Sequence, residues 1–482
     1  MASRMLVVGL DGLSPELVAR WRGDLPTLDA LMRAGIHGRL HSTVPAVTPP
    51  AWTAAMTGVN PGRFGFHDFL VRAGHEYADF RLVASTDQRA PGVDQLVAAA
   101  GGRACRVAVP VGYPPPELER GAVVACFFAP TSGHRLTFPP ALQRELEVVA
   151  GPYMIDATGP NGTAEERDRL LRTIVEMDAQ RFRMTRHLLR TRQWDLLWMV
   201  ALGTDRVAHY FFRDLDLAHP DHDAGSAWRD AVLQCYRACD RHLGELLDQA
   251  GDIPVLVLSD HGTQRIEGKV CLNEWLRDRG YLHCDPPAAP CSPREAPIRW
   301  GQTRAWAHGS GGAIYLNVVG REPQGVVAPE RYDAEVAALT EALLDLTTPD
   351  GRKLHVDVIE RRYVYDGPYA DNAPDLFVNV EDQRWLVSDQ VGTDTVFVDR
   401  NFGRDGACHA MTGFFALAGP GVRSGGDVPY ACLYDIAPTI LALLGLEIPA
   451  DCEGRSLLPP ASSPAVNAAD DAMSRLRALY LS

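Results

Sequence analysis

Six side chains of the kinds that bind divalent metals lie in four short stretches of this sequence. Three stretches follow apolar segments that predict buried strands, at residues 5–10, 194–200 and 253–258, and we expect the fourth to lie at a strand end as well. Because the carboxyl ends of parallel strands meet at one edge of a sheet, such distant stretches can converge there. The six residues are Asp11, Asp205, His209, Asp260, His261 and His409.

Together these residues offer three carboxylates and three imidazoles, the mixed oxygen and nitrogen ligands that zinc or manganese accepts. Asp205 and His209 are four residues apart and share one face of a helix. Asp260 and His261 are adjacent, and Gly262 supports the turn in which both can point inward. Each of these residues alone is more often a cap or a structural residue, so the prediction of a metal site depends on the joint pattern.

A hydroxyl group that could join this site belongs to Thr48. Pro49 and Pro50 lack backbone N–H groups and suit the first turn of a helix, which we expect over about residues 49–57. Thr48 is therefore predicted at the N-cap of that helix, where hydroxyl residues are favoured. Capping alone would explain its presence, and only the remote metal-type residues favour a catalytic role.

The chemistry that suits this set of residues is phosphoryl transfer. Two metal ions roughly 4 Å apart can hold both the attacking and the leaving oxygen of an in-line displacement at phosphorus. A Thr48 alkoxide bound to one ion would be the nucleophile, because the metal lowers the pKa of the hydroxyl without a general base. The pattern thus predicts a two-metal phosphohydrolase.

The elements that must position these residues alternate between strand and helix along the chain. This alternation predicts an α/β fold, a three-layer α/β/α sandwich with a mostly parallel central sheet. We expect a metal-binding core at residues 1–262 and 401–460, in which about 70–165 forms a rim or lid. Residues 263–400 are expected to form an inserted smaller α+β lobe, and 461–482 a C-terminal tail.

Composition narrows the range of partners and locations. The 482 residues carry a formal net charge of −14, which argues against a nucleic-acid polymer and against an anionic membrane surface as partners. No signal peptide is visible, and no apolar run reaches the ~18 residues of a membrane span. The ten cysteines include no CxxC pair, so we expect a reduced, cytoplasmic protein in which Cys235 and Cys239 pack without a disulfide.

Several motifs, in order along nearly the whole chain, resemble the alkaline phosphatase superfamily and within it the type I phosphodiesterase/nucleotide pyrophosphatase branch. The chain is most similar to a group of predicted phosphohydrolases or phosphomutases. The matching segments are Val8-Gly9-Leu10-Asp11-Gly12, Thr48-Pro49-Pro50-Ala51-Trp52, Thr57-Gly58-Val59-Asn60-Pro61-Gly62, Gly203-Thr204-Asp205-Arg206 with His209, Ser259-Asp260-His261-Gly262, and the segment of His409.

The resemblance implies how the ligands divide between two ions, most simply zinc, with manganese as an alternative. One ion would be held by Asp11, Thr48, Asp260 and His261. The other would be held by Asp205, His209 and His409. Thr48 would be phosphorylated during the reaction, and water would then release phosphate from it.

One departure from the family pattern concerns substrate binding. Nucleotide pyrophosphatases carry an Asn after a Gly-aromatic turn, and the segment Phe64-Gly65-Phe66-His67-Asp68-Phe69 has none. His67 could take the place of this Asn, or Asp68 could act through a water. Arg206, beside a predicted ligand, is a second candidate for holding phosphate, although a salt bridge explains it equally well.

The predicted activity is hydrolysis of a phosphate ester, either a diester or a monoester, with nucleotide-like substrates among the candidates. The nearest alternative is a phosphomutase, in which the phosphoryl group on Thr48 returns to another hydroxyl of the substrate. A noncatalytic metal-binding protein is a third alternative. The expected partner is a small phosphorylated substrate, with no nucleic-acid polymer and no membrane, and a homodimer is left open.

Overall fold

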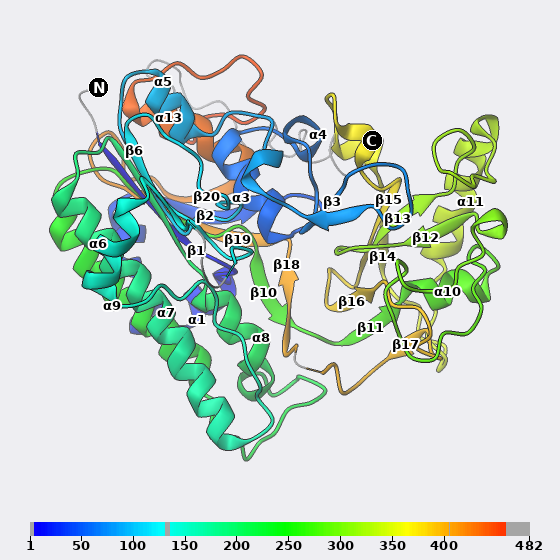
Figure 1. The fold of residues 1–482 in the computed structure, drawn as a ribbon. Helices are drawn as coiled ribbons and strands as arrows, with labels where there is room; N and C mark the ends of the chain where they lie inside the picture. The colour runs from blue at the N-terminus through cyan, green and yellow to red at the C-terminus, as the bar shows by residue number, and fades with distance from the viewer. Residues whose placement is uncertain (1–3, 131–134, 404, 459–482) are drawn as a thin grey trace.

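A mixed sheet of nine strands forms the centre of the part of the chain that the structure describes, residues 4–130, 135–403 and 405–458 of the computed structural model (Figure 1). Neighbouring strands are parallel, except that β19 is antiparallel to both its neighbours and β7 is antiparallel to β6. In spatial order the strands are β20 (Gly426–Cys432), β2 (Ile36–His41), β19 (Thr412–Ala418), β9 (Val255–Leu258), β1 (Met5–Leu10), β8 (Leu196–Ala201), β5 (Ala104–Val107), β6 (Gly121–Val124) and β7 (Thr137–Phe138).

The three central strands are buried on both faces because their sequences are continuous apolar runs. Every residue of β9, β1 and β8 is buried. A parallel strand covered by helices on both faces requires this pattern, whereas an exposed sheet face would require alternation with polar residues. These three strands, which the sequence predicted from their apolar segments, are also neighbours in the sheet.

Helices cover both faces of this sheet, so the predicted three-layer α/β/α fold is confirmed (Figure 1). One group of helices packs together through the long helices α7 and α9. It comprises α1 (Pro15–Arg20), α2 (Pro26–Ala34), α6 (Ala141–Ala150), α7 (Ala164–Thr191), α8 (Gly203–Leu215) and α9 (Ala231–Ala250). The other group comprises α3 (Thr48–Thr57), α4 (Pro61–Phe64), α5 (Val93–Ala99) and α13 (Ile436–Leu444).

A second, smaller sheet with its own hydrophobic core lies beside the central sheet (Figure 1). Its strands fall between residues 268 and 398, within the segment expected to form an inserted lobe. They are β12 (Ala305–Ala307), β13 (Ala313–Leu316), β15 (Leu376–Val380), β16 (Trp385–Ser388), β11 (Gly268–Cys271) and β17 (Phe397–Val398), with β14 (Val356–Glu360) paired to β15. Its helices are α10 (Leu272–Asp278), α11 (Tyr332–Leu344) and α12 (Arg361–Val364).

Two short antiparallel ribbons lie outside the two large sheets. The first pairs β10 (Gly262–Arg265) with β18 (Ala407–Ala410), and it connects the core with the smaller lobe at both of the lobe's ends. The second pairs β3 (Leu70–Arg72) with β4 (Phe80–Leu82), and Phe80 of this hairpin joins the hydrophobic core of the lobe.

The segment at about 70–165, expected as a rim or lid, therefore has several roles. Its strands β5 and β6 belong to the central sheet, and its hairpin packs on the smaller lobe. The exact domain boundaries stay a prediction. The expected tail at 461–482 lies outside the described residues.

The ten cysteines are all free thiols, and Cys235 and Cys239 form no disulfide, as their spacing predicted. None of the helices among the described residues combines the length and the apolar composition that crossing a bilayer requires.

Candidate active site

The predicted metal ligands gather at the edge of the sheet where β9, β1 and β8 end. Asp11 follows β1, and Asp260 with His261 follows β9. Asp205 and His209 lie in α8, which begins just after β8. Because the three strands are parallel and adjacent, their carboxyl ends bring these side chains to one place. The convergence expected from the sequence is therefore present.

The first group of side chains surrounds the Nε2 atom of His261. This atom lies 3.2 Å from Oδ2 of Asp260 and 3.8 Å from Oδ1 of Asp11. It also lies 3.3 Å from Oγ1 of Thr48, at the start of α3. All four side chains are buried, with exposed fractions of 4% or less. Two carboxylates, an imidazole and a hydroxyl thus share one small buried space.

The second group surrounds the Oδ1 atom of Asp205. Nε2 of His209 lies 3.3 Å from this oxygen, and Nε2 of His409 lies 3.6 Å from it. The rings of His261 and His409 are stacked with centroids 3.7 Å apart. The two groups therefore touch through these two imidazoles and form one continuous cluster.

The free atoms of the cluster have the chemistry that a metal requires. Oδ1 of Asp11, Oδ1 of Asp205 and Oδ2 of Asp260 are buried and accept no hydrogen bond of regular geometry. Buried carboxylate oxygens without donors are costly unless a cation binds them. The residues present therefore fit divalent metal ions.

The tautomers of two histidines support the same interpretation. Nδ1 of His261 lies 3.0 Å from the carbonyl oxygen of Gly262, and Nδ1 of His409 lies 2.8 Å from that of Ala46. A carbonyl oxygen can only accept, so each Nδ1 carries the proton and each Nε2 keeps a lone pair directed at the cluster. Metal-binding histidines are commonly held by such contacts of the second nitrogen.

Electrostatics in the cluster also favour bound cations. Burial raises the pKa of Asp11 well above its usual range, and the carboxylates of Asp260 and Asp205 raise it further. Burial raises the pKa of Asp260 as well. For Asp205, burial opposes ionisation, but His209 and Arg206 hold its pKa well below the usual range. Cations at the cluster would stabilise the ionised form of all three carboxylates.

Two positions differ from what the sequence predicted. The N-cap of α3 is Val47, and Thr48 is the first residue of the helix, so the predicted capping role of Thr48 is wrong. A Thr48 cap would accept from the N–H of Pro50 or Ala51, but Pro50 has none and that of Ala51 bonds to the carbonyl of Val47. The hydroxyl of Thr48 lies 3.3 Å from Nε2 of His261 instead.

His409 does not follow a strand of the central sheet, which corrects the second expectation. It lies within β18 opposite Thr263 of the small ribbon, just before β19. Because β19 is antiparallel to β9, it begins at the edge where the parallel strands end. This direction brings His409 to the other ligands.

The two candidate substrate contacts are both held by other side chains of the protein. The guanidinium of Arg206 lies 2.7 Å from Oδ2 of Asp205 and 2.8 Å from Oδ1 of Asp156, so it orients the Asp205 carboxylate of the cluster. Nε2 of His67 lies 3.3 Å from the hydroxyl of Tyr315, and its ring meets the edge of Phe377. The structure therefore does not bring His67 to the cluster.

Three contacts support the cluster and were not predicted. Nε1 of Trp52 donates to Oδ2 of Asp11 at 3.0 Å, and the N–H of Gly12 donates to Oδ1 of Asp260 at 3.1 Å. Oδ1 of Asp405 lies 3.5 Å from Nδ1 of His209. The four-residue spacing of Trp52 from Thr48 on one helix could have suggested its role. No sequence signal pointed to Asp405, because it lies in a loop and contacts His209 of α8, which is far away along the chain.

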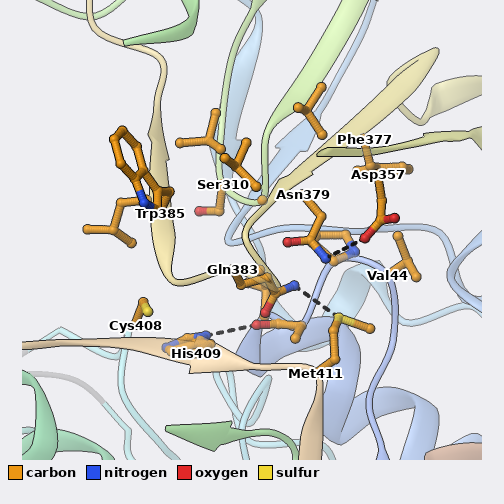
Figure 2. A pocket seen from close by; sticks show the side chains of 18 of the residues that line it. Val44, Ser310, Asp357, Phe377, Asn379, Gln383, Trp385, Cys408, His409 and Met411 are labelled. Carbon is orange, nitrogen blue, oxygen red and sulfur yellow. Dashed lines mark hydrogen bonds between the residues drawn. The ribbon is translucent and has the colours of Figure 1, made fainter. Parts of the chain in front are cut away.

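A cavity of about 990 Å³ adjoins the cluster (Figure 2). His209 and His409 form part of its wall on the side of the core. The loop at residues 44–47 and the strands β15 and β16 of the smaller lobe form much of the remainder. A cavity of this volume can hold the organic part of a small substrate.

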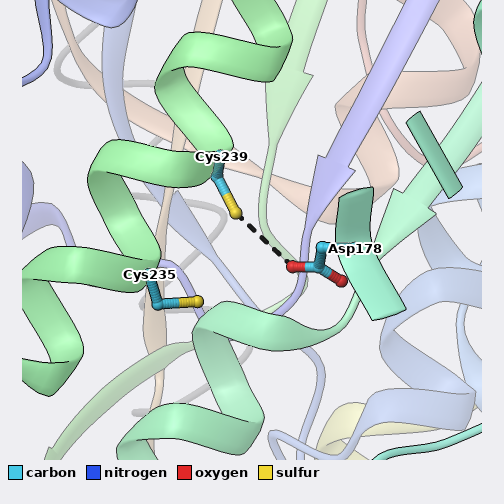
Figure 3. A group of neighbouring side chains, drawn as sticks. All are labelled: Asp178, Cys235 and Cys239. Carbon is cyan, nitrogen blue, oxygen red and sulfur yellow. Dashed lines mark hydrogen bonds between the residues drawn. The ribbon is translucent and has the colours of Figure 1, made fainter. Parts of the chain in front are cut away.

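A separate buried group consists of Asp178, Cys235 and Cys239, whose possible ligand atoms all lie within 4.8 Å of one another (Figure 3). The Asp178 carboxylate is already used, because it accepts the N–H groups of Leu202 at 3.0 Å and of Gly203 at 2.9 Å. The hydrogen bond with Cys235, together with burial, raises the pKa of the Cys239 thiol well above its usual range, which disfavours a thiolate ligand. We therefore interpret Asp178 as the anchor of α8.

The family that the sequence matches places this chain among the phosphoester hydrolases. The sequence model of the type I phosphodiesterase/nucleotide pyrophosphatase family matches residues 5–415, and the chain belongs to this family. Members of the family are metal-dependent phosphoesterases, in agreement with the resemblance noted from the motifs. No curated protein matches the sequence.

Several solved structures share the fold at low sequence identity. Phosphonoacetate hydrolase from Sinorhizobium meliloti 1021, solved with phosphonoacetate, has a TM-score of 0.57 at 16% identity over 92% of this chain and 95% of its own. An inactive variant of murine ectonucleotide pyrophosphatase/phosphodiesterase 5, solved with AMP, has a TM-score of 0.52 at 13% identity over 93% and 96%. The human enzyme of that name has 0.51 at 14% identity over 93% and 96%.

Proposed function

We propose that this enzyme hydrolyses a small phosphate ester in two steps, with Thr48 as the nucleophile. The observation that supports this most directly is the position of the Thr48 hydroxyl. It lies at the first residue of a helix, 3.3 Å from Nε2 of His261 and beside carboxylate oxygens that have no hydrogen-bond donors. A purely structural role would not explain why Thr48 shares this buried space with carboxylate oxygens that lack hydrogen-bond donors.

The cluster would hold two divalent ions, zinc or manganese. One ion would be bound by Asp11, Thr48, Asp260 and His261. The other would be bound by Asp205, His209 and His409. Such ions lower the pKa of a bound hydroxyl and neutralise charge on a phosphoryl group.

The chain's own residues would carry the reaction as follows. The oxygen of Thr48 forms a bond to phosphorus while the bond to the ester oxygen breaks, and the leaving alcohol takes up a proton. Water then attacks the phosphorus on Thr48 and restores the hydroxyl, releasing phosphate when the substrate is a monoester and a phosphate monoester when it is a diester. Pro49 and Pro50 fix the backbone at the start of α3, and the β-branched side chain of Thr48 has few rotamers, so the nucleophile stays oriented.

The substrate in this proposal is a small phosphorylated molecule rather than a polymer. The organic part would occupy the cavity of about 990 Å³ beside the cluster. Diesters and monoesters both remain candidates, because the contacts of the cluster leave the number of charged phosphoryl oxygens open.

The test uses the metal-loaded enzyme with p-nitrophenyl phosphate and bis(p-nitrophenyl) phosphate in water enriched in ¹⁸O. We expect Thr48→Ala to lower kcat by about a thousandfold or more while metal content stays the same, and Thr48→Ser to retain part of the activity. Acid quenching during turnover should trap phosphothreonine at position 48 in the wild type.

Three results would contradict the proposal. Full activity of Thr48→Ala would exclude Thr48 as the nucleophile. Transfer of phosphate to an added alcohol, with no ¹⁸O in the products, would favour a mutase. Bound metal without turnover of any ester would favour a noncatalytic role.

A further inference from the structure

The cavity beside the cluster has walls of two chemical kinds. Much of its surface is apolar, formed by side chains from the smaller lobe and the core (Figure 2). These include Val44, Val358, Phe377, Trp385 and Met411. An apolar group of the substrate would therefore gain free energy on entering the cavity.

Apart from the histidines, the charged residues of the wall are all acidic. They are Asp357, Asp382, Asp389 and Asp405, and no lysine or arginine is among the lining residues that the structure describes. Asp389 accepts from Nδ1 of His308 and from the N–H of Gly309, both at 2.9 Å. The carboxylate of Asp405 faces His209. These two aspartates are therefore already engaged by the protein.

The other two aspartates keep capacity for a cation. Ligand atoms of Asp357, Asp382 and His355 all lie within 4.8 Å of one another. The charged partners of these carboxylates lie beyond a usual hydrogen-bond distance, with His355 3.8 Å from Asp357 and Arg384 3.5 Å from Asp382. The side chain of Asp357 is 44% exposed and that of Asp382 is 71% exposed, and both residues line the cavity, so a cation can reach them.

Two amide oxygens on the same wall need hydrogen-bond donors. Nδ2 of Asn379 lies 3.3 Å from Oδ2 of Asp357, and since a carboxylate only accepts, the amide orientation is fixed. Oδ1 of Asn379 is then left buried with no partner, and so is Oε1 of Gln383. Both oxygens have almost no exposed surface, so they add negative potential behind the wall rather than direct contacts for a ligand (Figure 2). A positively charged ligand group would be attracted to the carboxylates and to this potential.

We propose that the substrate is a phosphate ester whose organic group is an apolar chain ending in a protonated amine. The inference rests on the proposed function, because that function places the phosphoryl group at the cluster. The apolar chain lies against Phe377 and Trp385, and the ammonium donates to Asp357. A carboxylate in the same position would face Asp357 and Asp382.

The test compares three esters that differ only at the far end of the chain: 6-aminohexyl, heptyl and 6-carboxyhexyl phosphate, each also as its methyl diester. The end group is six carbons from the ester oxygen, so the leaving oxygen is chemically the same in all three. We expect kcat/KM of the amino ester to exceed that of the heptyl ester about tenfold, and the carboxyl ester to be the poorest.

Binding measured without turnover separates this inference from the proposed function. Calorimetry with the metal-loaded Thr48→Ala variant should show the same order of affinities. Equal affinities, or tightest binding of the carboxyl ester, would overturn the inference even if the wild type hydrolyses all three. Preferential binding of the amino ester without any turnover by the wild type would instead overturn the hydrolase proposal.

A pair of variants tests the residue that carries the preference. Asp357→Asn keeps the shape of the side chain and removes its charge, so the ratio of amino to heptyl kcat/KM should fall from about tenfold to about threefold or less. Asp333→Asn, on the exposed surface of α11, changes the net charge equally but lies outside the cavity. The ratio should stay at its wild-type value in that control, and a fall there would assign the preference to the overall charge of the protein.

Discussion

The indole of Trp52 fixes one oxygen of Asp11 and leaves the other free. Nε1 of Trp52 donates to Oδ2 of Asp11 at 3.0 Å, whereas Oδ1 of Asp11 has no donor and lies 3.8 Å from Nε2 of His261. Trp52 is fully buried and lies in the same helix as Thr48. One helix therefore positions both the proposed nucleophile and a proposed metal ligand.

Replacing Trp52 with Phe should weaken metal binding. The variant keeps an aromatic ring but removes the N–H group, so Asp11 loses the contact that orients it. We expect metal affinity to fall about ten- to a hundredfold, the usual effect of losing a contact that supports a ligand. Competition between the protein and a chromogenic chelator measures this change.

Trp198 supplies a matched control for this experiment. It is equally buried and its ring packs edge-on to that of Trp52, but its own Nε1 has no hydrogen-bond partner. Trp198→Phe should therefore change packing to a similar degree while metal affinity stays close to that of the wild type. Equal losses in the two variants would show that packing, not the hydrogen bond, sets the affinity.

Removing Asp178 should loosen the start of α8, which carries Asp205 and His209. Asp178→Ala leaves the buried N–H groups of Leu202 and Gly203 without an acceptor, at a cost of about 1–3 kcal/mol for each group. We expect lower thermal stability and a weaker affinity for one of two bound ions, measured by calorimetric metal titration.

The neighbouring thiol of Cys239 provides a control for the Asp178 variants. Cys239 contributes a single 3.4 Å hydrogen bond to this carboxylate and none to the N–H groups at the start of α8. Cys239→Ala should therefore leave the affinities for both ions close to those of the wild type. Asp178→Asn retains one acceptor oxygen and should fall between the alanine variant and the wild type. A larger metal defect in Cys239→Ala than in Asp178→Ala would contradict the assigned role.

Chelation should destabilise the protein as well as inactivate it. Without cations the buried carboxylates of Asp11, Asp205 and Asp260 repel one another, and each keeps one oxygen without a regular hydrogen bond. We expect Tm to fall by about 3 °C or more after treatment with EDTA and dialysis, and to recover when zinc or manganese is added. A Tm that does not respond to chelation while activity is lost would place the required metal outside this cluster.

His67 should make the fold sensitive to acid. Burial lowers the pKa of His67 to about 3, whereas an unfolded histidine titrates near 6.5. Between these values the unfolded chain binds the extra proton, so the free energy of unfolding falls as pH drops. Urea unfolding of wild type and His67→Gln at pH 7 and pH 5 should show an additional loss of about 2 kcal/mol in the wild type.

Comparing the wild type with His67→Gln isolates the titration of His67, because Gln can still hydrogen-bond to Tyr315 but does not titrate. Identical pH dependence in the two proteins would mean that His67 titrates normally and is not buried as the structure shows.

Much of the site was predictable because its information is local. The apolar runs that became β1, β8 and β9 could be recognised from residue order alone, and Asp11, Asp205 and Asp260 follow them closely. The family motifs around Thr48 and Asp260 are also contiguous segments. The three-layer fold and the class of enzyme followed from these features and are confirmed by the structure and the family match.

Other features could not be read from neighbouring residues. That β9, β1 and β8 are adjacent, that β19 is antiparallel and carries His409 to the same edge, and that His67 is buried against Tyr315 all depend on contacts between segments far apart in the chain. Thr48 was predicted as a cap from local signals, and its contact with His261, more than two hundred residues away, is visible only in the structure.

The sequence by itself therefore identified the candidate catalytic residues and the kind of fold that holds them, since strand and helix signals are encoded over a few neighbouring residues. The tertiary structure alone decided which of those residues meet. It also decided that the smaller lobe closes an apolar, acidic cavity over them, because pairing order and lobe packing are set by long-range burial that no short segment contains.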